Sequence, residues 1–87
     1  MLADITEYLD RKIEQNNQRL IFTFYELRVK MDLTPPTVEK FLRLSETRLI
    51  NLGYKTYRSG EFYEYLGEQI IVKENELLIA IKENQQF

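Results

Sequence analysis

The chain has 87 residues, of which 44% are hydrophobic and 30% charged, and its formal net charge is −2. This length supports one domain with a single small core, and the apolar fraction argues against a wholly disordered chain. Cysteine and histidine are both absent, which excludes a disulfide framework and removes the commonest metal ligand and general base. Because the sequence has neither a membrane-spanning apolar run nor a signal-peptide pattern, we expect an intracellular, cytoplasmic protein.

Charge is distributed unevenly along the chain. Residues 1–18 hold two basic and four acidic side chains, residues 19–58 hold eight and four, and residues 59–87 hold two and six. A positive middle segment therefore lies between two negative ones. Ordinary scatter of surface charge would also produce such a difference. The positive segment is of interest because it coincides with the two adjacent helices described below.

The first third of the chain predicts a helix, a strand and a second helix. Residues 4–7 (DITE) have the form of a capping box, and apolar residues then recur at helical spacing, which predicts a helix over about residues 5–15. The short apolar run at residues 20–22 fits one small strand. A second capping box at residues 23–26 (TFYE) predicts a helix over about residues 24–31.

Two adjacent prolines mark the start of a third helix. Proline is tolerated at the first helical positions, so Thr34-Pro35-Pro36-Thr37 indicates a helix start, and Gly53 fits the glycine that follows a helix end. An apolar stripe connects the two ends and comprises Val38, Phe41, Leu42, Ser45, Leu49 and Leu52. Only the turn at Asp32 and Leu33 separates this helix from the one before it. The arrangement is a candidate helix-turn-helix over about residues 24–52.

Beyond this helix the pattern changes to strands. Residues 54–58 and 62–66 are rich in aromatic side chains and flank a plausible turn at residues 59–61. They predict a β-hairpin that ends at Gly67. The β-branched residues 70–72 predict one further strand.

The C-terminal segment is ambiguous. Residues 76–85 fit either a helix capped by Asn75 or a strand that returns through a turn at residues 74–75. We favour the helix because Leu77, Leu78 and Ile81 would share one of its faces. These three side chains are candidates for dimerisation within a segment spanning residues 69–87. The alternative is that the apolar run completes the core of the single chain.

The order helix, strand, helix, turn, helix and hairpin resembles the winged-helix family of DNA-binding domains, and the likeness covers roughly residues 5–72. Leu27 and Met31 stand where such domains keep apolar residues on their second helix, and Leu33 matches the buried residue of the turn. Residues 34–38 look like the start of the recognition helix in many repressors. The resemblance implies one α+β domain, a winged helix-turn-helix of three helices, a short strand and a wing at about residues 54–66.

The resemblance also implies a function and a set of site residues. It implies sequence-specific binding of double-stranded DNA by a homodimer that acts as a small transcriptional regulator or a replication or partition factor. The recognition-helix candidates are Thr34, Thr37, Glu39, Lys40 and Arg43, and the wing candidates are Lys55, Arg58, Ser59 and Gly60. Amides at the helix start would favour a nearby phosphate. No cofactor, metal, small-molecule effector or membrane is expected as a partner.

Two other binding functions stay open. The aromatic hairpin could stack unpaired bases, which predicts that Tyr57 and Tyr63 face outward. A winged helix can also dock on proteins without touching DNA, which predicts that Arg43 is held in ion pairs. Catalysis is not expected, because no glycine-rich phosphate loop and no nucleophile with its base are present. The richness in Lys, Glu, Asn, Ile and Tyr suggests an AT-rich microbial, plasmid or viral genome.

Overall fold

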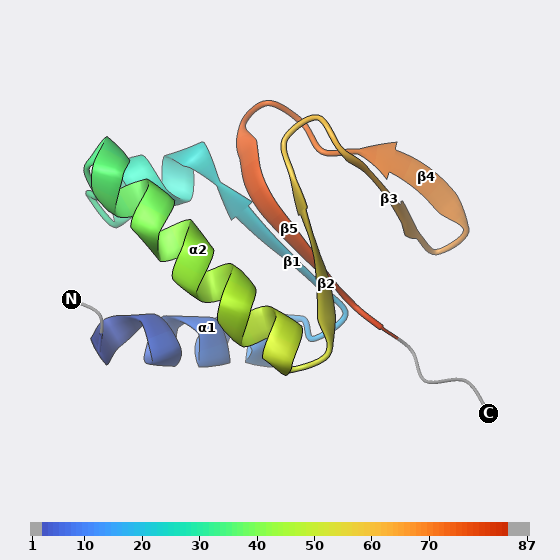
Figure 1. The fold of residues 1–87 in the computed structure, drawn as a ribbon, viewed down its shortest axis with the longest axis horizontal. Helices are drawn as coiled ribbons and strands as arrows, with labels where there is room; N and C mark the ends of the chain where they lie inside the picture. The colour runs from blue at the N-terminus through green and yellow to red at the C-terminus, as the bar shows by residue number, and fades with distance from the viewer. Residues whose placement is uncertain (1–2, 84–87) are drawn as a thin grey trace.

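The computed structural model describes residues 3–83, with side chains described from residue 7 onward (Figure 1). Within this range the chain is an α+β domain with three helical segments and five strands. Their order is α1 (Ala3–Gln15), β1 (Arg19–Thr23), the π-helical turn η1 (Tyr25–Lys30), α2 (Pro35–Asn51), β2 (Tyr54–Arg58), β3 (Phe62–Tyr65), β4 (Glu68–Ile71) and β5 (Glu76–Lys82). The helices and the first strand confirm the sequence-based prediction. The capping box expected at residues 4–7 requires the side chain of Asp4, which is not among the described side chains.

The last strand, β5, lies at the centre of a three-stranded antiparallel sheet of order β1-β5-β2. Phe22 of β1 and Arg58 of β2 both pair with Leu78 of β5. The helix favoured for residues 76–85 is therefore wrong over residues 76–82, where the strand alternative is right, and residues 84–85 of that prediction lie outside the described residues. Leu78, Ile79 and Ala80 are all fully buried, because β5 is a central strand that is covered on both faces. A strand in that position is apolar at consecutive residues. Such a run has no period of two and is easily mistaken for a buried helix.

This placement also corrects the dimerisation candidates. Leu78 is completely buried in the core on the helix side of the sheet, and Leu77 packs partly against the same cluster. Ile81 is half-buried on the other side. The run from Leu77 to Ile81 thus contributes to the core of the single chain: Leu78 is buried, and Leu77 and Ile81 are partly exposed.

The hairpin expected between residues 54–58 and 62–66 does not form, because β2 pairs with β5 and β3 pairs with β4. The chain instead builds one long two-stranded ribbon, with β2 and β3 on one side and β4 and β5 on the other. The ribbon reverses at Leu66 and Gly67, whose φ angles of 55° and 82° are typical of a tight two-residue turn. Residues 59–61, which have the composition of a turn, form a bend in the ribbon, and the chain does not reverse its direction there.

We call this bend, formed by residues 58–61 and 72–75, the corner. Pairing continues through it, because the Gly60 amide donates to the Val72 carbonyl at 2.9 Å and the Val72 amide donates to the Glu61 carbonyl at 2.8 Å. Gly60 has a φ of 90°, a conformation that suits glycine. Beyond the corner, β3 and β4 turn away from the direction of β2 and β5 (Figure 1).

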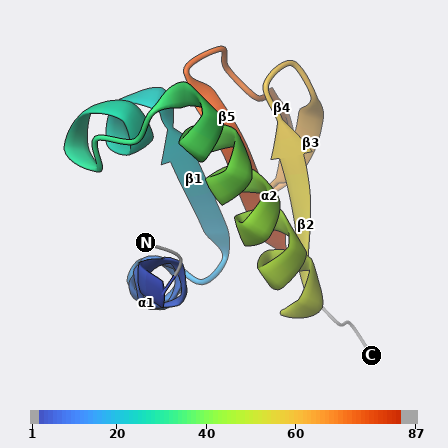
Figure 2. The same ribbon diagram turned by 60° about the vertical axis from the view of Figure 1, so that its left-hand side comes forward.

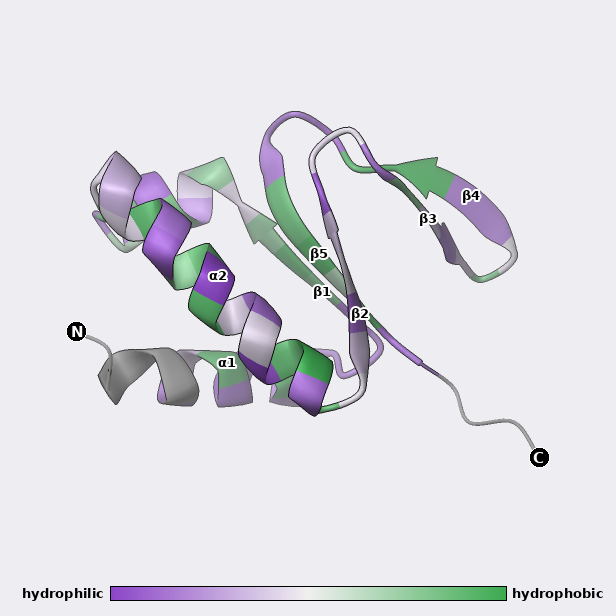
Figure 3. Ribbon diagram, in the orientation of Figure 1, coloured by the Kyte–Doolittle hydropathy of each residue, from purple (hydrophilic) through white to green (hydrophobic). Residues whose placement is uncertain are grey.

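The sheet has a hydrophobic cluster on each face. Figure 2 shows α2 in front of the sheet and the β3–β4 hairpin behind it. The helix-side cluster comprises Leu9, Leu20, Phe22, Leu27, Val38, Phe41, Leu42, Leu49, Tyr54, Leu78 and Ala80. The hairpin-side cluster comprises Tyr63, Val72 and Ile79, with Ile21, Tyr57, Tyr65, Ile70 and Ile81 packed against it. In Figure 3, hydrophobic and hydrophilic bands alternate along α2, as an amphipathic helix requires.

The end of α2 and the turn before it follow the sequence pattern closely. Gly53 has a φ of 95° and lies just past the helix end, as predicted. Leu52, expected in the buried stripe, is exposed because it follows the last helical residue. Asp32 adopts a φ of 56° in the turn, and the Leu33 amide donates to the Leu27 carbonyl at 3.0 Å.

Helix α1 is anchored to η1 by a half-buried polar cluster. The Tyr8 hydroxyl donates to the Glu26 carboxylate, and the Lys12 ammonium lies 2.9 Å from the same carboxylate. Burial, together with the hydrogen bond to Glu26 and its negative charge, raises the pKa of Tyr8 far above its ordinary value. The Glu26 amide donates a hydrogen bond of 3.2 Å to the Thr23 hydroxyl oxygen. This capping contact fixes the start of η1.

Candidate nucleic-acid interface

Helix α2 presents one continuous outward face opposite its buried stripe. The predicted residues Thr34, Thr37, Lys40 and Arg43 are all exposed there. The Thr34 and Thr37 hydroxyls are hydrogen-bonded to each other at 2.9 Å, which places two polar side chains side by side at the helix start. The structure therefore gathers these residues along one helix, as the sequence predicted.

The start of α2 is poor in backbone donors. Pro35 and Pro36 occupy its first two positions and carry no amide hydrogen. The Val38 amide is already bonded to the Thr34 carbonyl at 2.8 Å. Of the four amides at this helix start, those of Thr34 and Thr37 remain. The two prolines therefore halve the number of amides that could hold a phosphate, and the two threonine hydroxyls lie beside those that remain.

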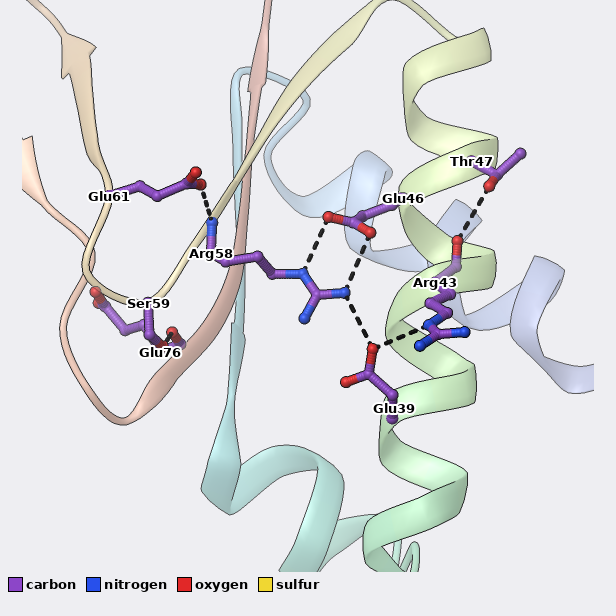
Figure 4. A network of polar contacts seen from close by, with 8 residues as sticks. All are labelled: Glu39, Arg43, Glu46, Thr47, Arg58, Ser59, Glu61 and Glu76. Atoms are coloured by element: carbon purple, nitrogen blue, oxygen red, sulfur yellow. Dashed lines mark hydrogen bonds and ion pairs between the residues drawn. The ribbon is translucent and has the colours of Figure 1, made fainter.

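A chain of ion pairs links α2 to the sheet (Figure 4). The Arg58 guanidinium bonds both oxygens of Glu46, with Nε at 3.0 Å and Nη2 at 3.1 Å. The same Nη2 lies 3.7 Å from Glu39, whose carboxylate also accepts a hydrogen bond of 3.1 Å from Arg43. The hydrogen bonds to Glu46 raise the pKa of Arg58.

Arg58 therefore differs from its expected role as a free wing side chain. Its side chain is only 34% exposed and points toward α2. Because it bonds Glu46 with two parallel donors, it fixes the end of β2 relative to the helix. It also compensates the charge of Glu39 and Glu46, two carboxylates that would otherwise repel a phosphate backbone.

The corner lies at the end of β2 that Arg58 anchors. Ser59 and Gly60 are exposed, and the Ser59 hydroxyl donates to the Glu76 carbonyl at 2.6 Å. The Arg58 amide donates to the Glu61 carboxylate at 2.6 Å, which tightens the bend. These contacts hold the corner in one conformation next to the sheet.

Lys73 is a basic residue of the corner that the sequence analysis missed. It is exposed and follows Val72, which pairs with Gly60 and Glu61 across the bend. The sequence predicts a hairpin that ends at Gly67, and this prediction leaves Lys73 outside any site. Only the pairing of residues 58–61 with residues 72–75 could have revealed it.

Lys55 lies apart from the other predicted site residues. Successive side chains of a strand point to opposite faces, and Arg58 of β2 contacts α2. Lys55 therefore shares the opposite face with Tyr57, which packs in the hairpin-side cluster. The wing prediction combined Lys55 with Arg58, Ser59 and Gly60, but the fold separates it from them.

The aromatic side chains of the hairpin do not form an open stacking platform. Tyr63 is only 4% exposed, and its ring lies 5.7 Å from that of Tyr57. Its hydroxyl accepts a hydrogen bond of 3.2 Å from Arg19, whose guanidinium lies 4.3 Å from the Tyr65 ring centre. The outward orientation expected for single-strand binding is wrong for Tyr63, because the hairpin folds over the sheet and buries it.

Two absences hold for the described part of the chain. Among the residues in the range 3–83, no group of three or more His, Cys, Asp or Glu side chains is placed to hold a metal ion. No helix in that range has the length and apolar character needed to cross a membrane. The comparisons add no relative: no known family model, no curated protein and no solved structure matches the chain significantly.

Proposed function

We propose that this protein is a winged-helix domain that binds double-stranded DNA through α2. The observation that carries the proposal is the connection of the sheet. Strand β1 lies between α1 and η1, and the ribbon strands β2 and β5 both follow α2. Strand β1 pairs with β5, so the sheet has the order β1-β5-β2. This is the arrangement expected of a winged helix, in which the third helix is exposed for reading a groove.

The exposed face of α2 has the chemistry for such a contact. Lys40 and Arg43 are cations on one face, and arginine can donate two hydrogen bonds to guanine in a major groove. Thr34 and Thr37 supply hydroxyls for phosphate or base edges. The corner adds Ser59, Gly60 and Lys73 as backbone contacts. In this proposal Arg58 acts indirectly, because it sets the position of the corner relative to α2.

The ion pair between Arg43 and Glu39 has to open when DNA binds. Both side chains are exposed, at 75% and 49%, and an exposed pair of this kind contributes little free energy. A phosphate or a guanine can therefore replace Glu39 as the partner of Arg43 at a small cost. The biological role in this proposal is a small transcriptional regulator or a replication or partition factor. A homodimer that reads two half-sites would need a surface other than the buried Leu78 of β5.

The test is fluorescence anisotropy of a labelled mixed-sequence duplex titrated with the protein at several salt concentrations. We compare Arg43→Glu with Arg11→Glu, which are matched because each arginine pairs with a glutamate four residues earlier and is similarly exposed, at 75% and 71%. We expect Arg43→Glu to weaken binding about tenfold or more, and Arg11→Glu to change it less than about twofold. Affinity should fall steeply with salt.

A second candidate function is docking on a protein. It is favoured by Leu44 and Ile50, two large apolar side chains that α2 exposes at 41% and 56%, and by the ion pair of Arg43 with Glu39. Absence of duplex binding at low salt, with wild type and variants folded, would favour this function. Equal losses for Arg43→Glu and Arg11→Glu would show that only net charge matters and would refute recognition by α2.

A further inference from the structure

A hollow of about 410 Å³ opens beside the corner, between β2 and the β3–β4 hairpin. The residues that line it are Lys55, Tyr57, Phe62, Tyr63, Glu64 and Gln69. The volume falls within the range of ligand sites in proteins. Because Tyr57 and Tyr63 belong to the hairpin-side cluster, the hollow lies on the face of the sheet opposite α2. It is separate from the proposed DNA interface.

The hollow combines aromatic rings with an available carboxylate. Phe62 is 56% exposed, although a large apolar side chain gains from being covered. Glu64 is exposed and, among the residues that the structure describes, takes part in no ion pair. Gln69 is the cross-strand partner of Glu64 and adds a second hydrogen-bonding group next to it. These groups suit a planar ligand that is apolar on its faces and donates hydrogen bonds from its edge.

The same hairpin already binds one such group within the chain. The Arg19 guanidinium lies 4.3 Å from the ring centre of Tyr65 and donates to the Tyr63 hydroxyl at 3.2 Å. A guanidinium is weakly hydrated, stacks on aromatic faces and matches a carboxylate with two parallel donors. The hollow likewise offers an aromatic ring, that of Phe62, and it adds the Glu64 carboxylate, which the Arg19 site lacks.

The surrounding charge favours a cation. Two exposed carboxylates lie on the hairpin, Glu64 in the hollow and Glu68 outside it. Lys55 opposes a cation, but its ammonium is on an exposed side chain whose charge water can screen. An anionic ligand would gain only Lys55 and would face the carboxylates of the hairpin.

We infer that this hollow binds an arginine side chain of a basic partner peptide, with the guanidinium against the exposed Phe62 ring and its donors on Glu64, two residues that lie on the same face of β3. The site would allow the domain to recruit a basic protein from the side of the molecule that faces away from α2. This inference does not depend on DNA binding.

The test is an NMR titration of ¹⁵N-labelled protein with the peptide acetyl-Gly-Ser-Gly-Arg-Gly-Ser-Gly-amide and with its lysine and glutamate counterparts. We expect shifts centred on Lys55, Phe62, Glu64 and Gln69 for the arginine peptide, with weaker binding of the lysine peptide and none of the glutamate peptide. Glu64→Gln should weaken arginine binding about fivefold or more. Glu68→Gln, which removes the same charge from a hairpin residue outside the hollow, should change it less than about twofold.

Two further variants complete the test. Phe62→Ala removes an exposed ring without opening the core, and it should weaken binding as Glu64→Gln does. Lys55→Gln should strengthen binding, since it removes the opposing charge. Equal losses for Glu64→Gln and Glu68→Gln would overturn the inference, because they would show general attraction only. Binding of the glutamate peptide, or no shifts around the hollow, would overturn it as well. Duplex binding by Glu64→Gln should equal that of wild type, so failure here leaves the DNA proposal unaffected.

Discussion

Replacing Arg58 by methionine tests whether the ion-pair chain of Figure 4 holds the fold together. Methionine keeps an unbranched apolar stem but removes the guanidinium that bonds both oxygens of Glu46 at 3.0 and 3.1 Å. The two side chains are 34% and 26% exposed, so the pair is neither a surface pair nor a fully buried one. The variant also leaves Glu46 and Glu39 near each other without the cation between them.

The magnitude lies between two known limits. Exposed ion pairs contribute about 0–1 kcal/mol, whereas removal of one partner from a buried pair costs about 3–5 kcal/mol. For this half-buried, two-donor pair we expect Arg58→Met to lower the free energy of unfolding by about 2 kcal/mol. In a domain of this size such a loss lowers Tm by roughly 10 °C.

The assay is urea unfolding of wild type, Arg58→Met, Glu46→Met and the double variant, followed by circular dichroism. The double variant should lose less than the sum of the single variants, with a coupling free energy of about 1–2 kcal/mol, because it leaves no unpaired charge. Glu39→Gln is the control, since its oxygen lies 3.7 Å from Arg58, and it should cost less than about 0.5 kcal/mol. A coupling free energy near zero, or an Arg58→Met loss below about 0.5 kcal/mol, would refute the reasoning.

Three further predictions concern stability. Ser45→Ala should raise the free energy of unfolding by about 1 kcal/mol in thermal melts, because the fully buried Ser45 hydroxyl has no hydrogen-bond partner within the described residues and alanine favours a helix. Leu66→Asn should stabilise by about 0.5 kcal/mol in urea titrations, since Leu66 is 85% exposed at a φ of 55° and Asn-Gly suits this turn. Stability should fall as pH rises above about 10, measured by urea unfolding at each pH. Burial raises the folded-state pKa of Tyr8 and Tyr54, so these phenols ionise first in the unfolded chain. Tyr8→Phe should reduce this pH dependence, and an unchanged slope would contradict the assignment.

The helices could be predicted from the sequence because their signals are local. The two prolines after Thr34 specify where α2 begins, and Gly53 specifies where it ends. The stripe from Val38 to Leu49 then determines which side of the helix is buried. The exposed side chains Lys40 and Arg43 follow directly, because they lie on the opposite side of a helix whose period is known.

The ribbon could not be predicted in the same way, because strand pairing is not local. Residues 54–58 and 62–66 looked like partners since they are neighbours in sequence, yet each pairs with a strand that follows later. The turn chemistry at Gly60 is compatible with a bend as well as with a reversal. The clearer signal was Gly67, whose two-residue turn with Leu66 separates strands of equal length.

Only the part of the candidate site that depends on local signals could be predicted. Its residues on α2 follow from one helix, whereas Arg58 and Lys73 depend on contacts between distant segments. Arg58 lies twelve residues after Glu46, the acid it bonds, and the corner brings Lys73 beside Gly60 only through the pairing of Val72. Nothing in the residues near Arg58 distinguishes a side chain that anchors a strand from one that is free in water.

The most direct test of DNA recognition by α2 is a map of the surface that a duplex covers. We would titrate the ¹⁵N-labelled protein with a mixed-sequence duplex at low salt and follow every backbone amide by NMR. The account predicts that the largest shifts fall on residues 34–48 of α2 and on Ser59, Gly60 and Lys73 of the corner. Shifts confined to the hairpin, residues 62–71, or no shifts at any protein-to-DNA ratio would contradict it.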